Sequence, residues 1–585
     1  MNKVWTHQPK YTPTQHKELF NSLYSFAKNK STESESAYSI FAKLLLQRDI
    51  SSVEEAIQFN DISFSKLHDP FIMQNMELAT GRIIRAISDK EQIMIYGDYD
   101  VDGTTSVALM MSFLKDLTPH LTYYIPDRYN EGYGISIQGI ETAKKQNVKL
   151  IIALDCGIKA IDQVEFANSK NIDFIICDHH TPGEEIPNAH AILNPKQKNC
   201  SYPYKELSGC GIGFKLCQAL ALKLNIDNER VFNLLDLAAI SIACDIVPLT
   251  GENRVLASLG LQLINSHPKP NISSILESKN KKTTISDLVF QAGPRINAAG
   301  RISSGKTAVD LLLANTSDEI AFFSNQISNY NSERKKEDLR TTNEALQILQ
   351  EQDSAGSSNT TVLYHPNWHK GVIGIVASRL IEHHYRPTIV LTKSKNDILS
   401  GSVRSVKGFN VYNALEKCQN EILQFGGHQY AAGLTLKESQ LSDFKIKFEE
   451  TVSLQMSSDK FVPEINYDAE IELSDISQLL KRFIDKLEPF GPMNMTPTFI
   501  SRGILGTTNC RAVGQDKSHL KLELTNTSKH IKIPGIAFGL GHLADEILDG
   551  RLFDIAFSID INYWNNMEIL QLMVKDIKFQ DMRSQ

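Results

Sequence analysis

The sequence predicts a multidomain α/β protein with a parallel-sheet domain, long linking helices, a second α/β lobe and a C-terminal β-barrel. From Ile93 onward, short apolar runs typical of strands buried on both faces alternate with helix-like segments. A long polar stretch rich in helix formers follows, and the last part has short strand-like runs separated by turn residues. The length of 585 residues also predicts several domains, because single cores rarely grow past about 250–300 residues.

These patterns divide the chain into five regions. We expect a helical lead-in packed on the parallel-sheet domain, then that domain, the linking helices, the second lobe and the barrel, at residues 1–92, 93–307, 308–360, 361–457 and 461–585. In the lead-in, residues 42–46 and 76–87 carry apolar side chains at helical spacing. The stretch SAGSSNT at 354–360 predicts a flexible break after the linking helices.

Composition is that of an ordinary globular protein, with 42% hydrophobic and 22% charged residues. No apolar run reaches about 18 residues and the N-terminus lacks the apolar core of a secretion signal, so we expect a cytoplasmic protein with no transmembrane helix. The eight cysteines form no Cys-x-x-Cys pair, which argues against a disulfide scaffold or a zinc site. The net charge of −7 predicts no general affinity for nucleic acid, although a local groove can still be basic.

Three aspartates follow the first buried-strand run. Residues 93–96 are apolar, and Asp98, Asp100 and Asp102 then stand at alternate positions before a predicted helix at 104–114, which its threonines could cap. Buried carboxylates are unfavourable unless a cation neutralises them, and hard oxygen ligands suit Mg2+ or Mn2+. A solvated acidic turn would explain the same residues, so this stretch alone leaves both interpretations open.

Later apolar runs end in the same kind of residue. The run at 149–154 ends at Asp155, the run at 173–177 is followed by Asp178, His179 and His180, and the run at 237–244 ends at Asp245. Ligands of open α/β sheets bind at the carboxyl edge of the strands, so four such segments together favour a metal site. A single histidine is more often structural, but an adjacent pair favours a functional role, with Asp178 fixing the tautomer of an imidazole.

Four motifs occur in order along this domain: GDYDVDG at 97–103, DCG at 155–157, DHH at 178–180 and ACDIVP at 243–248. They resemble the successive motifs of the DHH phosphoesterase superfamily. The similarity continues in LSGCGIGFKL at 207–216, GPRINAAGR at 293–301, WHKGVIGIVASR at 368–379, GSVRS at 401–405 and GGHQYAAG at 426–433. This longer series resembles the branch of bacterial single-strand-specific DNA exonucleases over nearly the whole chain.

The resemblance implies two bound divalent metal ions, Mn2+ or Mg2+. It matches the metal ligands to Asp100, Asp102, Asp155, His179 and Asp245, with Asp155 bridging the two ions. Asp98 and His180 match positions at the same site, and their division between metal and substrate stays open. Asp178 is expected to support the histidines.

The resemblance also implies contacts to DNA phosphate from both lobes. The candidates are Arg128, Arg295, Arg301, Ser402, Arg404, Gly426, Gly427 and His428. Arg128 lies in a segment where basic and aromatic residues interleave, as single-strand grooves require. Turn glycines can bring backbone amides close to a phosphate, although a packing turn is the ordinary interpretation. The glycines at 209–213 lack dinucleotide-binding spacing, so we interpret them as close packing at a helix start.

The two C-terminal regions have their own strand signals. Residues 362–364 and 388–391 predict strands of the second lobe, and 371–381 predict a helix. Strand-like runs at 520–524, 531–533, 553–561 and 569–574 predict a small barrel. EPFGPMN at 488–494, PTF at 497–499 and GIAFG at 535–539 resemble the oligonucleotide-binding barrel of the family, although Met495 stands where the family has proline. We expect no further partner-binding domain after it.

The function implied by the resemblance is a metal-dependent, single-stranded-DNA-specific exonuclease. It would release mononucleotides in the 5′→3′ direction during DNA repair and recombination, as a monomer, cooperating with a helicase and a single-strand-binding protein. One alternative is a DHH phosphodiesterase for short oligonucleotides or cyclic dinucleotides, which the barrel region argues against. Another is a non-catalytic nucleic-acid scaffold, which the full ligand set argues against.

Overall fold

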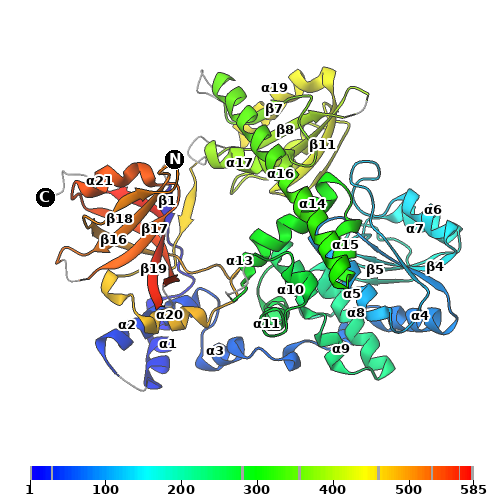
Figure 1. The fold of residues 1–585 in the computed structure, drawn as a ribbon, viewed down its shortest axis with the longest axis horizontal. Helices are drawn as coiled ribbons and strands as arrows, with labels where there is room; N and C mark the ends of the chain where they lie inside the picture. The colour runs from blue at the N-terminus through cyan, green and yellow to red at the C-terminus, as the bar shows by residue number, and fades with distance from the viewer. Residues whose placement is uncertain are drawn as a thin grey trace. The chain divides into compact units, whose positions relative to one another are not determined.

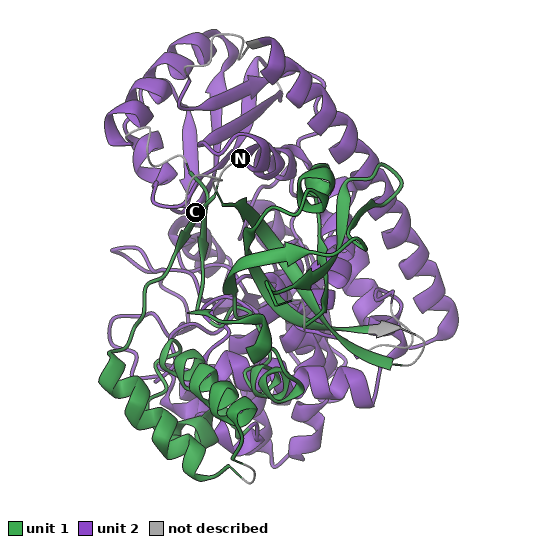
Figure 2. Cartoon of the chain, turned by 90° about the vertical axis from the view of Figure 1, so that its left-hand side faces the viewer, with its two compact units in different colours: residues 1–61, 462–490, 494–585 green, residues 62–461, 491–493 purple. Residues whose placement is uncertain are grey.

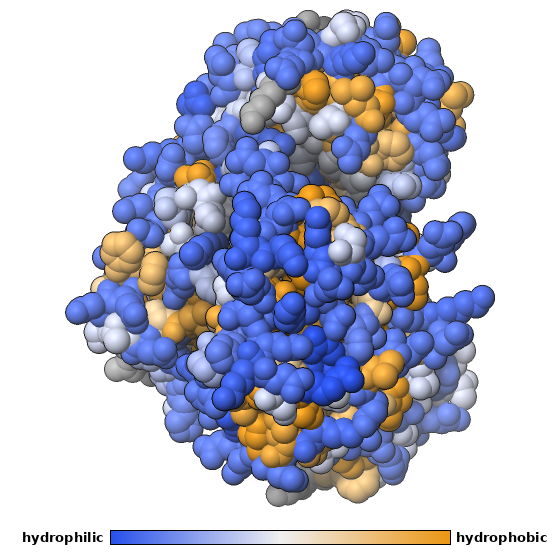
Figure 3. Space-filling model, turned by 90° about the vertical axis from the view of Figure 1, so that its right-hand side faces the viewer, coloured by the Kyte–Doolittle hydropathy of each residue, from blue (hydrophilic) through white to orange (hydrophobic). Residues whose placement is uncertain are grey.

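The computed structural model describes residues 3–27, 30–277, 282–352, 358–394, 396–456, 462–528, 531–564 and 567–580. The chain divides into two compact units, coloured in Figure 2: residues 1–61, 462–490 and 494–585 form one, and residues 62–461 and 491–493 form the other. Among the described residues, no helix is both long and apolar enough to cross a membrane. Figure 3 shows a face on which hydrophilic residues predominate and apolar residues form separate patches.

The larger unit contains a five-stranded, all-parallel sheet with strand order β3-β2-β4-β5-β6. Its strands are β2 (Gln92–Gly97), β3 (Leu121–Tyr124), β4 (Val148–Leu154), β5 (Asp173–Cys177) and β6 (Ala191–Leu193). Strand β3 pairs with one side of β2, and β4, the next strand in the chain, pairs with the other side. Such a switch point leaves room for a ligand beyond the carboxyl ends of the two strands.

Helices cover both faces of this sheet (Figure 1). On one face pack α5 (Val101–Leu114), α8 (Gly209–Leu224) and α10 (Leu235–Cys244); on the other lie α6 (Ile137–Lys145) and α7 (Ile161–Ser169). The side chains of β2 alternate between two cores, Ile93 and Ile95 in one and Met94 and Tyr96 in the other. Burial on both faces explains why the strand is a continuous apolar run.

Two local predictions are wrong in this domain. The run at 237–244 belongs to a helix, α10, and not to a strand of the sheet, yet its C-terminal end still delivers Asp245 to the carboxyl edge. Helix α5 starts at Val101, ahead of the predicted start, because Asp100 caps it by accepting a hydrogen bond from the Gly103 amide at 3.0 Å. A cap at this position places Asp102 in the first helical turn.

Of the remaining helices of this unit, α4 precedes the sheet in the chain, and the others follow it before the second lobe. They are α4 (Met76–Ser88), α9 (Asn228–Phe232), α11 (Gly251–Ser266), α12 (Pro270–Ser273), α13 (Ile285–Asp287), a π-helical turn at Leu288–Ala292, α14 (Gly293–Ile302), α15 (Lys306–Leu313) and α16 (Ser317–Gln352). The 36-residue α16 confirms the predicted long linking helix. Of the predicted break at 354–360, residues 354–357 lie outside the described part of the chain.

The second lobe has a mixed five-stranded sheet in the order β10-β11-β9-β8-β7. Its strands are β7 (Thr361–Tyr364), β8 (Thr388–Lys393), β9 (Ile398–Arg404), β10 (Gln424–Gly427) and β11 (Ala431–Lys437), and its helices are α17 (Ile373–His383), α18 (Val411–Glu416) and α19 (Leu441–Gln455). The predicted strands and helix of this lobe are therefore present. Buried Leu391, Val403 and Leu434 on adjacent strands share one core with Phe444 and Phe448 of α19.

The smaller unit is built around a closed barrel. Pairing runs β14-β18-β19-β17-β16, and β16 pairs with β14 again to close the ring. The five strands are β14 (Phe499–Gly506), β16 (His519–Thr525), β17 (Ile533–Ala537), β18 (Phe553–Trp564) and β19 (Met567–Phe579). The predicted barrel is confirmed, because a five-stranded ring is the architecture of oligonucleotide-binding folds. Short elements complete the unit: β1 (Val4–Thr6), β12 (Glu464–Asn466), β13 (Ala469–Glu470), β15 (Arg511–Val513) and α21 (Ala544–Leu548).

The N-terminal helices belong to this smaller unit. Helices α1 (Pro13–Ser25), α2 (Thr32–Leu46) and α3 (Val53–Asn60) share a core with α20 (Gln478–Asp485) and the barrel. The rings of Phe41 and Phe483 stack with centroids 4.7 Å apart. The expected packing of the lead-in on the parallel-sheet domain therefore holds for residues from 62 onward, including Met76 and Ile83. The expectation is wrong for α1, α2 and α3, which pack with the barrel instead.

Candidate metal centre and active site

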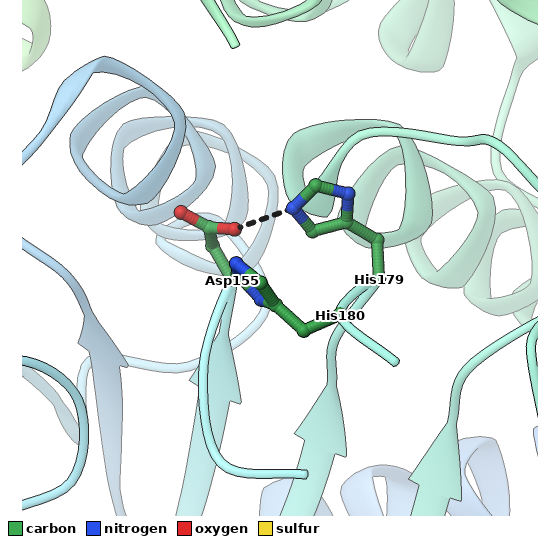
Figure 4. Close-up of side chains that lie close together, drawn as sticks. All are labelled: Asp155, His179 and His180. Atoms are coloured by element: carbon green, nitrogen blue, oxygen red, sulfur yellow. Dashed lines mark ion pairs between the residues drawn. The ribbon is translucent and has the colours of Figure 1, made fainter. Parts of the chain in front are cut away.

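Four predicted ligands converge at the carboxyl edge of the parallel sheet. The Nε2 atom of His179 lies 3.2 Å from Oδ1 of Asp155, 3.4 Å from Oδ2 of Asp245 and 4.0 Å from Oδ2 of Asp102. Figure 4 shows the imidazole of His179 directed at the Asp155 carboxylate, with His180 beside it. Asp102, Asp155 and His179 are buried, and Asp245 is partly buried. Asp155 and His179 follow strands β4 and β5, Asp102 lies in the first turn of α5, and Asp245 is the C-cap of α10.

Asp102 is fixed by the start of helix α8. Its Oδ2 accepts a hydrogen bond from the Gly209 amide at 2.7 Å, and its Oδ1 accepts from the Cys210 amide at 2.8 Å. The Ser241 hydroxyl, on α10, donates to the same Oδ1 at 2.7 Å. Amides at a helix N-terminus suit a carboxylate because they are unpaired donors at the positive end of the helix dipole. The carboxylate is therefore held in one orientation.

Gly209 also explains the glycine-rich segment. A Cβ atom at this position would lie 2.6 Å from the Cβ of Asp155 and 2.7 Å from its Oδ1. No real side chain tolerates such distances, so the start of α8 approaches the ligand only because residue 209 is glycine. Close packing at a helix start, as predicted, is the role of this glycine.

The cluster consists of three carboxylates and one imidazole, with no lysine or arginine among its four members. Burial, followed by repulsion from neighbouring carboxylates, raises the pKa of Asp155, Asp98 and Asp245 well above the usual range. Burial lowers the pKa of His179 to about 4, so its imidazole is neutral and available as a ligand. Acids packed in this way require a cation if they are to be ionised together at neutral pH.

Unpaired polar atoms fit the same requirement. Within the described part of the chain, five buried atoms in the cluster and in the adjoining Asp98 have no hydrogen-bond partner: Asp98 Oδ2, Asp155 Oδ1, Asp245 Oδ2, and Nδ1 and Nε2 of His179. Buried polar atoms are almost always paired, so a group of orphaned ligand atoms indicates a place for ions. Carboxylate oxygens with one imidazole suit Mn2+ or Mg2+. The donor set fits the divalent cations that the resemblance implies.

The backbone around two of these ligands is strained. Asp155 has φ +60° and Ile246, which follows Asp245, has φ +61°. The left-handed region is uncommon for aspartate and a genuine outlier for a β-branched residue. Strain of this kind persists where the surrounding fold imposes it, and it clusters at functional sites.

Asp178 and His180 form a hydrogen-bonded pair beside the cluster. The buried Asp178 accepts from Nδ1 of His180 at 2.7 Å and from the Ile158 amide at 2.8 Å. Burial opposes ionisation of Asp178, but these hydrogen bonds and the charge of His180 lower its pKa to about 2. The geometry agrees with the predicted supporting role of Asp178. The Nε2 atom of His180 faces the Tyr133 hydroxyl at 3.2 Å, and ligand atoms of His180, His179 and Asp155 lie within 4.8 Å of one another.

Asp98 and Asp100 lie at the end of β2, beside this cluster. Asp98 is fully buried, with Oδ1 accepting from the Gly134 amide at 3.3 Å. Asp100 uses Oδ1 to cap α5. Burial, and then the charge of Asp102, raises the pKa of Asp100. Each of the two carboxylates thus has one oxygen engaged by the backbone, and the unengaged Oδ2 of Asp98 is buried.

The second lobe contributes to the same region. The ring of His428 lies parallel to that of His180, with centroids 6.4 Å apart and an interplanar angle of 9°. Arg404 donates from Nη1 to the Ser402 hydroxyl at 3.0 Å, and Arg301 donates from Nη1 to the Gly371 carbonyl at 3.1 Å. The His180–His428 contact and the Arg301–Gly371 hydrogen bond each join a site residue of the first domain to the part of the chain that follows the linking helix.

Three of the predicted arginines form one positive group. Burial and the nearby charges of Arg128 and Arg404 are among the causes that lower the pKa of Arg301 to about 10. Burial, and then the charge of Arg128, also lowers the pKa of Arg404. In the described residues none of these three guanidinium groups is in an ion pair, and Arg128 lies 5.0 Å from the ring centroid of Tyr99. Unpaired cations held close together indicate a site for an anion.

Three further predicted substrate residues have different surroundings in the structure. Gly427 has φ +146° and a Cβ there would lie 2.4 Å from the Ala431 carbonyl oxygen, so the turn requires glycine, whereas Gly426 has open space around it. The role of Arg295 stays a prediction: its guanidinium donates to the Ile275 carbonyl at 2.9 Å and pairs with Glu277 at 2.7 Å. The structure does not bring it into the arginine group.

Sequence reasoning missed several residues that hold the site. Ser241 and the Cys210 amide bind Asp102, Tyr133 faces His180, and Asn194 donates to the His180 carbonyl at 2.9 Å. Tyr133 lies in the same basic and aromatic segment as Arg128, so a role at the site could have been predicted from the sequence. Asn194 follows strand β6 directly, so its position at the carboxyl edge was also available from the strand pattern.

Comparison with known protein families gives three matches in order along the chain. The DHH family N-terminal domain matches residues 92–242, the DHHA1 domain 357–454 and the RecJ OB domain 467–576. The fold and site thus define a protein of the DHH class, with a DHHA1 lobe and an added oligonucleotide-binding barrel.

The single-stranded-DNA-specific exonuclease RecJ of Bacillus subtilis is 37% identical, covering 92% of this chain and 67% of that protein. The Haemophilus influenzae RecJ is 32% identical, covering 93% and 96%. The chain belongs to the RecJ family.

Solved structures agree with this assignment. RecJ from Thermus thermophilus in complex with Mn2+ superposes with a TM-score of 0.82 at 23% identity, covering 99% of this chain and 80% of that one. A second structure, exonuclease RecJ bound to manganese, has a TM-score of 0.58 at 27% identity, covering 67% and 96%. The first comparison shows a common fold along nearly the whole chain.

Proposed function

We propose that this protein is a single-stranded-DNA-specific exonuclease that hydrolyses phosphodiester bonds with two divalent cations, Mn2+ or Mg2+. The observation that carries the proposal is the set of buried, unpaired ligand atoms on Asp155, His179 and Asp245. The names of its relatives, which are single-stranded-DNA-specific exonucleases, support the substrate. A manganese-bound RecJ structure at 27% identity supports the cation.

Two sets of ligands that share Asp155 would hold the cations. Asp102, Asp155, His179 and Asp245 would hold one cation, since their ligand atoms converge within the distances given above. Asp100 and Asp98, with Asp155, would hold the other. When bound, the cations supply Lewis-acid chemistry, lowering the pKa of an attacking water and neutralising charge on the phosphate.

The protein's own residues orient the substrate. His180, held by Asp178, and His428 of the second lobe face each other and can donate hydrogen bonds to the scissile phosphate. Arg301, Arg404 and Ser402 would bind the terminal phosphate of the strand. A strand anchored by its terminal phosphate would present its first phosphodiester bond to the acid cluster, which would release mononucleotides from the 5′ end.

The barrel and the biological setting extend this proposal. We infer that the five-stranded barrel guides the incoming strand, as such barrels bind oligonucleotides. The protein would act in the cytoplasm as a monomer, in DNA repair and recombination, on strands opened by a helicase and covered by a single-strand-binding protein. Light scattering of the purified chain tests the monomer, and pull-down with each of the two partner classes tests the cooperation.

One assay tests the enzymatic proposal. A DNA oligonucleotide labelled at either end is offered single-stranded or as a blunt duplex, with Mn2+ or with EDTA. We expect metal-dependent release of mononucleotides from the 5′ end of the single strand alone. Survival of long DNA with cleavage of dinucleotides would favour a short-substrate phosphodiesterase instead, and binding without cleavage would refute catalysis.

A further inference from the structure

Two lysines lie at the same edge of the parallel sheet as the histidine pair. Lys159 follows strand β4, four residues after Asp155, and Lys196 follows strand β6. Strands β5 and β6 pair in parallel with Cys177 opposite Leu193, so the residues after them emerge side by side. Lys196 is therefore a topological neighbour of His179 and His180.

Lys196 is tied to the histidines by a short chain of hydrogen bonds. Its backbone amide donates to Oδ1 of Asn194 at 2.8 Å, and Nδ2 of Asn194 donates to the His180 carbonyl at 2.9 Å. Its ammonium pairs with Glu206 at 3.1 Å, and its side chain is 25% exposed. The lysine is held in place, and its ammonium keeps donors beyond the one that faces Glu206.

The positive charges around the cluster act on different residues. Lys196 acts electrostatically on His179 and Asp245 of the first domain and on His428 of the second lobe, and Lys159 also acts on His428. Arg128 instead acts on Asp98 and Asp100, and on Arg301 and Arg404. The strand order β3-β2-β4-β5-β6 agrees with this, because Arg128 follows β3 at one end of the sheet and Lys196 follows β6 at the other. Between them, Asp98 follows β2 and His179 follows β5. The arginine group therefore lies toward the Asp98 side of the carboxyl edge, and Lys196 lies toward the His179 side.

We propose that Lys196, assisted by Lys159, binds the backbone phosphate that follows the scissile bond on its 3′ side. This rests on the proposed function. If the terminal phosphate lies at the arginine group and the scissile phosphate at the acid cluster, the next phosphate along the strand falls on the lysine side. A lysine meets a phosphate as a point charge without reading the base, which suits an enzyme that must accept every sequence.

Substrate length separates this contact from the others. A 5′-phosphorylated dinucleotide has a terminal and a scissile phosphate but none beyond, whereas a 5′-phosphorylated nonanucleotide has all three. With Mn2+ present, we expect K196Q to raise KM for the nonanucleotide about tenfold with kcat within about twofold of wild type. Dinucleotide cleavage should stay within about twofold. K196R should restore most of the affinity, and K159Q should raise KM about threefold.

The matched control is K149Q, which removes one exposed lysine charge at the start of β4, the opposite edge of the sheet. In K196Q the slope of log(kcat/KM) against log salt for the nonanucleotide should fall by about 0.7, and in K149Q it should not change. Equal loss on both substrates would overturn the inference, because Lys196 would then serve the scissile or terminal phosphate. Wild-type KM in K196Q would also overturn it. A wild-type chain that cleaves neither substrate would instead refute the proposed function.

Discussion

The Oδ1 atom of Asp155 lies 3.2 Å from Nε2 of His179, and neither atom has a hydrogen-bond partner among the described residues. The two side chains come from the ends of adjacent strands β4 and β5. Two buried polar atoms facing each other without a hydrogen bond are costly unless a third group lies between or beside them. This relationship is the basis of the metal-site assignment.

Replacing Asp155 with asparagine should abolish cleavage while leaving the fold intact. The change keeps the shape of the side chain but removes the charge shared by both ligand sets, so we expect a loss of at least about a thousandfold in kcat/KM. Because burial and then neighbouring carboxylates raise the pKa of Asp155, the uncharged variant should also melt at a higher temperature than wild type in EDTA. Residual activity near the wild-type level would remove Asp155 from the centre.

Manganese should stabilise the wild-type chain and not this variant. Ligands that bind only the folded state add about 2.7 kcal/mol at a hundredfold excess over Kd. Thermal melts of wild type and D155N in EDTA and in Mn2+ measure this difference. An equal shift in both proteins would mean that the cation binds elsewhere.

Gly209→Ala and Gly211→Ala should differ sharply although both lie in the first turn of α8. A Cβ at 209 would lie 2.6 Å from the Asp155 Cβ, whereas the nearest atom to a Cβ at 211 is the Ser208 hydroxyl at 3.4 Å. We therefore expect G209A to lose cleavage and manganese-dependent stabilisation, and G211A to keep both and to gain up to about 1 kcal/mol from helix propensity. Similar behaviour of the two variants would contradict the close packing.

Ser241→Ala tests how Asp102 is held. The variant removes the 2.7 Å hydrogen bond to Oδ1 of Asp102 but leaves the amides of Gly209 and Cys210 in place. Removing such a supporting contact typically reduces metal affinity or activity by about 10–100-fold. Manganese titration of activity measures it, with S266A on the exposed end of α11 as the control. An unchanged manganese requirement would show that the amides suffice.

Arg404→Gln should reduce the preference for a 5′-phosphorylated end. A charge-assisted contact to phosphate contributes about 1.5–3 kcal/mol, so kcat/KM on a phosphorylated strand should fall by about 10–100-fold. A strand with a 5′-hydroxyl should be affected far less. R85Q, an exposed arginine of α4, is the control. An equal loss on both strands would place Arg404 away from the terminal phosphate.

Much of the site was predictable because parallel strands deliver their following residues to one edge. This places Asp98, Asp155 and His179 together once the strands are recognised. Asp245 was found by the same pattern although its run is helical, since a helix packed on the sheet can end at that edge too. The capping role of Asp100 was missed because a threonine cap fits the local sequence equally well.

Other features depend on tertiary partners that local patterns do not specify. The apolar face of α2 predicts that the helix packs on something, but Phe483, far away in the sequence, supplies the contact. Arg295 matched a substrate position, and only the fold shows its guanidinium bound by Glu277. Ser241 lies inside an apolar helix, where nothing local distinguishes it from an ordinary core residue.

Anomalous diffraction from crystals grown with manganese tests the central claim most directly. We predict two peaks about 3.5–4 Å apart, both within bonding distance of Asp155, with His179 and Asp245 on one of them. A single peak that leaves Asp155 unbound, or peaks only outside this cluster, would contradict the two-cation site.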